Sequence, residues 1–100
     1  MAQPIYQIFL MKNTEAWYQL SQEEKDSISN KIGDSLKEVG AEAIVLCDAS
    51  WSTETWQAFG LIKFPDIEAL KKHREDSNKL EWARYTDAMS VMGTELQLSP

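Results

Sequence analysis

The sequence predicts an α+β domain in which a four-stranded antiparallel sheet carries its helices on one face. Short apolar segments alternate with longer segments whose apolar residues recur at helical spacing. Their order is strand, helix, strand, strand, helix, strand, within 100 residues that we assign to a single domain, residues 1–100. The predicted strands are apolar on both sides, so both faces of the sheet have to be covered.

Four strands are expected, each bounded by residues that favour turns. They lie at residues 4–12, 42–48, 55–64 and 92–98. Asn13-Thr14 ends the first strand, and Pro65-Asp66 ends the third and offers a helix cap. Residues 49–54 form a polar loop that carries Trp51.

Two helical regions separate these strands. The first begins after Ser21, which forms a capping-box pattern with Glu24, and ends near Gly40, a residue type favoured at helix C-termini. The second covers residues 67–90, and a change of phase in its apolar stripe predicts a break at Asp76-Ser77-Asn78. Right-handed crossovers place both regions on one side of the sheet, which is the ferredoxin-like βαββαβ plan.

Alternation along the strands sorts their residues into two faces. The set with small and purely apolar residues is assigned to the helices: Tyr6, Ile8, Leu10, Val45, Cys47, Ala58, Gly60, Ile62, Leu96 and Leu98. The other set mixes large apolar with polar groups: Gln7, Phe9, Met11, Ile44, Leu46, Asp48, Gln57, Phe59, Leu61, Lys63, Glu95 and Gln97. Such a mixture suits a ligand pocket and a partner interface equally. A homodimer through this open face is expected.

Composition excludes several classes of function. The net charge of −6 argues against a nucleic-acid or anionic-membrane surface, and the single cysteine, Cys47, excludes a disulfide framework and a multi-cysteine zinc site. No phosphate-binding glycine loop or metal-ligand spacing is present, so we expect neither a cofactor nor a metal. The start lacks a signal-peptide pattern and no segment is long enough to span a membrane, which predicts a cytoplasmic protein.

Several local motifs resemble those of a known group of proteins. They are Lys12-Asn13-Thr14-Glu15-Ala16-Trp17, Leu20-Ser21-Gln22-Glu23-Glu24, Phe64-Pro65-Asp66-Ile67-Glu68-Ala69, and the pair Trp82 and Tyr85. Together they resemble an uncharacterised family of small bacterial proteins in the dimeric α/β-barrel superfamily, near darcynin-like, YCII-like and antibiotic-biosynthesis-monooxygenase-like proteins. The resemblance implies two sheets packed face to face across a dimer axis, with ligands between each sheet and its own helices or in the barrel.

The same resemblance implies a range of functions. Members include cofactor-free oxygenases, haem-degrading oxygenases, polyketide cyclases, isomerases and modules without known chemistry. The segment around Trp82 does not match the Asn/Trp/His set of the haem-degrading branch. We therefore expect a protein that binds an aromatic or polyketide-like compound and, if it is an enzyme, a cofactor-free oxygenase, cyclase or isomerase. The alternative is a non-catalytic dimerisation or stress-related module.

Three side chains are candidates for catalysis. His73 titrates near neutral pH and is interpreted either as a base at a pocket mouth or as part of a solvated face. Asp48 is a general base if buried with a raised pKa, or else it simply starts a loop. Tyr85 is a candidate hydrogen-bond donor. The candidate ligand-binding residues are Gln7, Phe9, Trp56, Phe59 and Trp82, whose aromatic members suit packing equally well.

Overall fold

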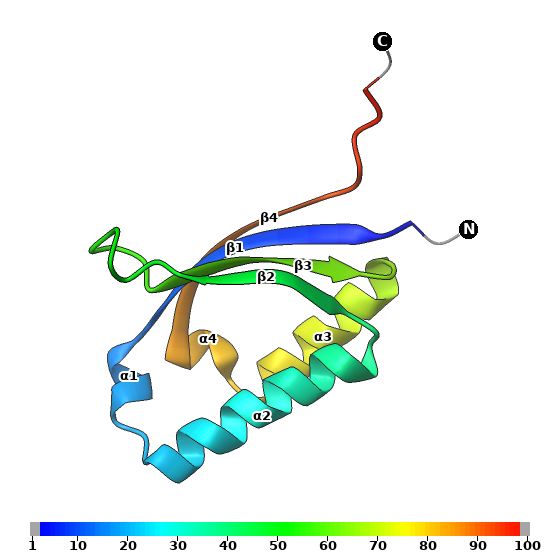
Figure 1. Ribbon diagram of the computed structural model, residues 1–100. Helices are drawn as coiled ribbons and strands as arrows, with labels where there is room; N and C mark the ends of the chain where they lie inside the picture. The colour runs from blue at the N-terminus through cyan, green and yellow to red at the C-terminus, as the bar shows by residue number, and fades with distance from the viewer. Residues whose placement is uncertain (1–2, 99–100) are drawn as a thin grey trace.

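A computed structural model describes residues 3–98 as one sheet with its helices on one side (Figure 1). The elements are β1 (Ile5–Asn13), α1 (Glu15–Tyr18), α2 (Gln22–Glu38), β2 (Glu42–Asp48), β3 (Ala58–Phe64), α3 (Ile67–Lys79), α4 (Trp82–Tyr85) and β4 (Thr86–Gly93). The strand order is β2-β3-β1-β4, with every neighbouring pair antiparallel. The predicted α+β fold class is confirmed. Within residues 3–98, no helix is long and apolar enough to cross a membrane.

The helix ends follow the local sequence signals. Ser21 Oγ accepts from the amide of Glu24, and Glu24 Oε1 accepts from the amide of Ser21, both at 3.1 Å, which completes the predicted capping box. Gly40 follows the end of α2 with φ of +78°, a backbone conformation that glycine adopts without steric cost. The carboxylate of Asp66 accepts from the amide of Ala69 at 2.8 Å and caps α3.

The second helical region is divided into two helices as predicted, but the break lies later than Asp76-Ser77-Asn78. Asp76 and Ser77 use their side chains in contacts compatible with a continuous helix, so α3 runs on to Lys79. The helical path ends at Glu81, which has φ of 56° and separates α3 from α4.

The predicted last strand at 92–98 is also wrong, because the strand starts earlier. β4 begins at Thr86 and pairs with β1 from Asn13 opposite Thr86 to Tyr6 opposite Gly93. Residues 94–98 lie outside any strand. The third strand starts at Ala58, three residues later than predicted, because residues before it complete the preceding loop.

The core lies between the sheet and the helices. Ile62, Phe64 and Leu70 are buried there, and Phe64 is fully enclosed. Partly buried neighbours complete the cluster: Ile5, Phe9, Leu36, Val39, Ala41 and Ala69. Ile5 lies opposite Phe64, and Phe9 lies opposite Gly60, so these residues of β1 and β3 share the helix side.

This register corrects part of the predicted sorting of faces. Ala58, Gly60 and Ile62 lie on the helix side as expected, but Tyr6, Ile8 and Leu10 lie opposite Lys63, Leu61 and Phe59 on the open side. In β2, Val45 and Cys47 likewise lie opposite Leu61 and Phe59, while Leu46 and Asp48 lie opposite Gly60 and Ala58. Alternation within one strand shows which residues share a face. It does not show which face of that strand aligns with which face of its neighbour.

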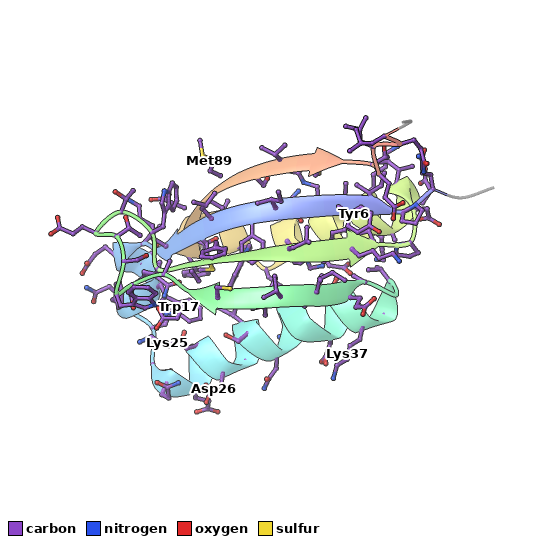
Figure 2. The ribbon with its side chains drawn as sticks, turned by 45° about the horizontal axis from the view of Figure 1, so that its top comes forward. Tyr6, Trp17, Lys25, Asp26, Lys37 and Met89 are labelled. Carbon is purple, nitrogen blue, oxygen red and sulfur yellow. The ribbon has the colours of Figure 1, made fainter. Side chains whose placement is uncertain are left out.

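The open face is apolar, and no helix of residues 3–98 covers it. Figure 2 views it obliquely, with Tyr6 on β1 and Met89 on β4. Ile8, Phe59, Met89 and Val91 are exposed, and Val91 reaches 68%. The helices therefore cover only one of the two apolar faces of the sheet.

Candidate functional site

Two open grooves flank the end of β4, one on each side of the sheet. The open-face groove has a volume of about 520 Å³, and its lining includes Tyr6, Ile8, Leu61, Val91 and Glu95. The helix-side groove has a volume of about 370 Å³, and its lining includes Ile5, Ile67, Leu70, Lys71 and Arg74. Met92, Gly93 and Thr94 line both.

The open-face groove has apolar walls and one polar pair. The hydroxyl of Tyr6 donates to Glu95 Oε1 at 2.9 Å, and the ammonium of Lys63 lies 5.9 Å from the centre of the Tyr6 ring. This hydrogen bond to a carboxylate is the main cause that raises the pKa of Tyr6. The phenol therefore keeps its proton at neutral pH and fixes the chain just beyond β4.

The helix-side groove combines apolar walls with two cations. Lys71 and Arg74 lie one turn apart on α3, beside Ile67 and Leu70. Lys71 makes an exposed ion pair with Glu68 at 3.8 Å, and within residues 3–98 Arg74 makes no ion pair. Among residues 3–98, no acidic residue lines this groove, although the protein as a whole carries a net charge of −6. Its chemistry matches an anion with an apolar body.

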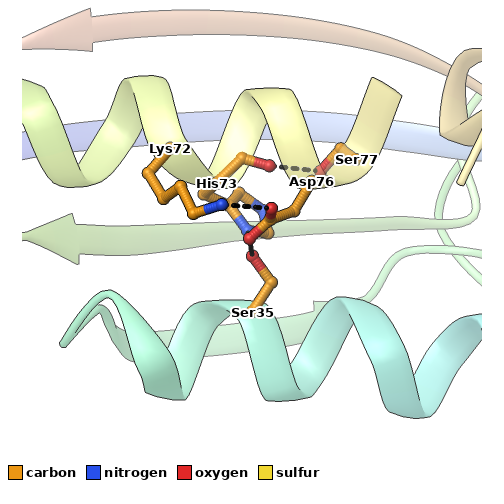
Figure 3. A network of polar contacts seen from close by, with 5 residues as sticks. All are labelled: Ser35, Lys72, His73, Asp76 and Ser77. Atoms are coloured by element: carbon orange, nitrogen blue, oxygen red, sulfur yellow. Dashed lines mark hydrogen bonds and ion pairs between the residues drawn. The ribbon is translucent and has the colours of Figure 1, made fainter. Parts of the chain in front are cut away.

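His73 lies between α2 and α3, away from both grooves. Its Nδ1 is 2.9 Å from Ser35 Oγ, and Ser35 donates to Asp76 Oδ2 at 2.7 Å (Figure 3). A serine hydroxyl has one proton, so His73 Nδ1 carries the hydrogen that Ser35 accepts. Asp76 Oδ1 also receives a hydrogen bond from Lys72 Nζ at 3.0 Å. Because Ser35 is buried and Lys72 is exposed, this chain of contacts joins the two helices from the core to the surface.

The ionisation of this network follows from its contacts. Burial lowers the pKa of His73, and the nearby Asp76 carboxylate opposes that effect. Hydrogen bonds from Ser35 and Lys72 lower the pKa of Asp76, and the same carboxylate raises the pKa of Lys72. At neutral pH the network therefore holds a neutral imidazole beside an ion pair.

Asp48 is the last residue of β2, directly before the loop. It is exposed and accepts hydrogen bonds from the amide of Ser50 at 2.9 Å and from its hydroxyl at 2.6 Å. These bonds lower the pKa of Asp48. The interpretation of Asp48 as a buried carboxylate with a raised pKa is therefore wrong. Asp48 instead starts the loop, which was the other interpretation of the sequence.

Trp82 and Tyr85 form an aromatic cluster with Trp17. The ring of Trp17 meets that of Trp82 edge-on, with centroids 6.1 Å apart, and lies 6.4 Å from that of Tyr85. The amide of Thr14 donates to the carbonyl of Tyr85 at 3.0 Å, which ties α1 to α4. The cluster packs two short helices together at the end of β1 where α1 begins.

The remaining predicted ligand residues are spread over the molecule. Gln7 and Phe9 lie on the helix side of β1, Phe59 lies on the open face, and Trp56 is half-buried before β3. The structure thus brings Trp82 and Tyr85 together and leaves the others apart.

Lys71, Arg74 and Ser35 were not among the site residues predicted from the sequence. Lys71 and Arg74 are spaced three residues apart beside Ile67 and Leu70, a pattern that could have placed two cations beside an apolar wall. Ser35 occupies a position at helical spacing from Ile28, Ile32 and Val39, and a polar residue in such a stripe is a signal of a buried hydrogen bond. Among residues 3–98, no group of three or more acidic, histidine or cysteine side chains is arranged to hold a metal.

Comparison with known proteins gives structural but not sequence matches. No family model matches, and no curated protein matches. A protein of unknown function from Rhodopseudomonas palustris matches with a TM-score of 0.67 and 13% identity, over 98% of this chain and 86% of that one.

Two further solved structures share the fold. A dimeric, ferredoxin-like protein of unknown function from Bacteroides fragilis has a TM-score of 0.51 and 16% identity, over 95% of this chain and 100% of that one. SnoaB from Streptomyces nogalater, a cofactor-independent oxygenase, has a TM-score of 0.51 and 10% identity, over 99% of both chains. At such identities the likeness concerns the fold, and the chain has the ferredoxin-like α+β fold that its resemblance to dimeric α/β-barrel proteins predicted.

Proposed function

We propose that this chain is a cytoplasmic small-molecule-binding protein that acts as a homodimer through its open sheet face. The observation that carries the proposal is the continuous apolar surface of Ile8, Phe59, Met89 and Val91, all exposed on one face. Monomeric proteins rarely leave such a surface in water, and a small domain gains stability from covering it. The dimeric description of the Bacteroides fragilis protein supports the same arrangement.

The proposed ligand site is the helix-side groove. Packing of two open faces leaves this groove free, since Ile5, Ile67 and Leu70 lie on the other side of the sheet. Its walls suit the apolar part of an aromatic or polyketide-like compound. Arg74 matches the planar geometry of a carboxylate, and Lys71 adds a second positive charge. The proposed ligand class is therefore an apolar organic acid or enolate.

The proposed chemistry, if the protein is an enzyme, is a cofactor-free oxygenation, cyclisation or isomerisation. Such reactions pass through enolate-like anions, which nearby cations stabilise. The cofactor-independent oxygenase SnoaB shares the fold. Catalytic roles for His73, Asp48 and Tyr85 stay predictions, because none of the three lines either groove.

A non-catalytic dimerisation module is the second candidate. A different observation favours it: the three predicted catalytic side chains have structural contacts away from the grooves. Ligand binding to the dimer separates the two candidates.

The dimer is tested by light scattering at micromolar concentration. The wild-type chain is expected to have the mass of two copies, and Val91→Asp is expected to be monomeric because it places a charge in the apolar interface. Trp51→Asp is the matched control, because Trp51 is 84% exposed in the loop before β3, and this variant should stay dimeric. A monomeric wild-type chain contradicts the proposal.

Ligand binding is tested by thermal shift with aromatic and polyketide-like acids and their neutral amides. A ligand at about 100 times its Kd stabilises the folded state by about 2.7 kcal/mol, which raises the Tm of a domain of this size by about 10 °C or more. Arg74→Gln should reduce the shift with the acids, and Lys37→Gln, which removes an exposed cation on α2, should not. If no acid shifts the Tm of the dimer, the dimerisation module is the function that remains.

A further inference from the structure

The middle of α3 contacts two different parts of the molecule. Lys71 and Arg74 line the helix-side groove, whereas His73 and Asp76 contact Ser35 of α2 (Figure 3). Successive residues of an α-helix are about 100° apart around its axis, so Arg74 lies roughly a quarter of a turn from His73. The rotation of α3 about its axis therefore decides both where the groove cations lie and whether the contacts to Ser35 form.

The two groove cations have few other contacts that hold them in place. Both are exposed, and within residues 3–98 Arg74 makes no ion pair. The ion pair of Lys71 is with Glu68, one turn earlier on the same helix, so it does not tie Lys71 to the sheet. The position of these cations relative to the end of β4, which forms another wall of the groove, therefore follows from the position of α3.

Apolar packing alone does not fix the rotation of α3. Ala69 and Leu70 pack against the core, and apolar contacts have no preferred direction. Hydrogen bonds are directional, because they weaken steeply when their length or angle departs from the ideal. The buried hydroxyl of Ser35 accepts from His73 at 2.9 Å and donates to Asp76 at 2.7 Å. One side chain of α2 thus holds α3 at two points about one turn apart.

A small rotation of α3 is enough to prevent recognition of an anion. A group about 6 Å from the helix axis moves by about 2 Å when the helix turns by about 20°. A hydrogen bond from a guanidinium to a carboxylate spans only about 2.7–2.9 Å, so a shift of this size breaks it. Rotation of α3 would therefore remove the anion contact of the groove while its apolar walls stay in place.

We infer that the network of Ser35, His73 and Asp76 positions the cationic side of the helix-side groove. The network acts through the rotation of α3, which carries Lys71 and Arg74. This inference rests on the proposed function, since it gives the network a role in binding an anionic ligand there. The three residues are positioning residues, because none of them lines the groove.

The test compares an aromatic carboxylate with its neutral amide, 1-naphthoate with 1-naphthamide. The apolar body is the same in both probes, so the ratio of their Kd values from NMR titration reports the anion contact. The wild-type chain is expected to prefer the acid. Ser35→Ala and Asp76→Ala should each reduce this preference by about tenfold, the factor expected when a hydrogen bond to a charged group is lost. Asp76→Asn keeps an oxygen that accepts from Ser35 and should retain most of the preference.

Gly60→Ala is the control for lost stability. A Cβ on Gly60 would lie 2.8 Å from the carbonyl oxygen of Val45, so this variant strains the sheet at a position outside the groove. It should lose stability as Ser35→Ala does and yet keep the preference for the acid. All titrations are made at a temperature at which circular dichroism shows every variant to be folded.

The outcomes separate this inference from the proposed function. A wild-type chain that binds the acid and the amide equally well overturns the proposed anion site and the inference with it. A wild-type preference that Ser35→Ala and Asp76→Ala leave unchanged overturns the inference alone. An equal loss of preference in Gly60→Ala and Ser35→Ala also overturns it, because lost stability would then explain both.

Discussion

Phe9 lies directly opposite Gly60 in the register of β1 and β3, and its ring occupies the space that a side chain at position 60 would need. A Cβ built on Gly60 would lie 2.8 Å from Phe9 Cε2 and 2.7 Å from Leu46 Cδ2. It would also lie 2.8 Å from the carbonyl oxygen of Val45, which is backbone and cannot move as a side chain does. The glycine in the middle of β3 thus lets three strands hold an aromatic ring against the core.

Gly60→Ala is expected to destabilise the protein by about 1–3 kcal/mol, the usual cost of overpacking a core. Urea unfolding followed by circular dichroism measures the change. Gly33→Ala is the control, because a Cβ there meets nothing within 4 Å. Alanine has a higher helix propensity than glycine in the middle of α2, so this variant should be more stable by about 0.5–1 kcal/mol. Equal effects of the two substitutions would contradict this account of Gly60.

Ser35→Ala is expected to destabilise the protein by about 1–3 kcal/mol, because it leaves His73 and Asp76 without their shared buried partner. Ser29→Ala, at an exposed position on the same helix, should be neutral or slightly stabilising. Chemical unfolding of both variants at pH 7.5 provides the comparison. A neutral Ser35→Ala would mean that the contact between α2 and α3 is not energetically important.

The stability of the protein is expected to fall as the pH drops below the ordinary histidine value of 6.5. The pKa of His73 is lower in the folded state, so between these two values the unfolded chain binds more protons than the folded one. Well above pH 6.5 the imidazole of His73 is neutral in both the folded and the unfolded state, so it does not reduce the stability there. His73→Asn should flatten this part of the curve of unfolding free energy against pH. Parallel curves for the variant and the wild type would rule out His73 as the cause.

Trp82→Phe is expected to cost about 0.5–1.5 kcal/mol, because a smaller ring loses the edge-on contact with Trp17. Trp51→Phe should leave the stability unchanged, since Trp51 is largely exposed. Thermal unfolding monitored by circular dichroism measures both. If Trp82→Phe leaves the Tm unchanged but abolishes ligand-induced shifts, Trp82 is a ligand-binding residue rather than a packing residue.

Features set by neighbouring residues could be predicted from the sequence. The capping box of Ser21 and Glu24 and the glycine after α2 depend on contacts within a few residues, and both are found where expected. The side of the sheet that Tyr6 and Ile8 face depends on the register between β1 and β3. That register is set by packing across 50 or more residues of chain, so alternation alone predicted the wrong side.

The candidate site was predictable only in part. Trp82 and Tyr85 are neighbours on a short helix, so their proximity follows from local sequence. The grooves form where β4 ends beside α3, and a strand placed at 92–98 could not reveal them. Lys71 and Arg74 line a groove only because the end of β4 lies next to them.

The backbone at Glu81 decides how the rest of the chain is distributed. Its left-handed conformation, unusual for a residue with a side chain, turns the chain back toward the sheet after α3. β4 is therefore complete at Gly93, and residues 94–98 lie outside the sheet. If α3 had continued to residue 90, those residues would have been needed for the fourth strand. One turn of backbone thus decides which residues form the fourth strand and which lie beyond it.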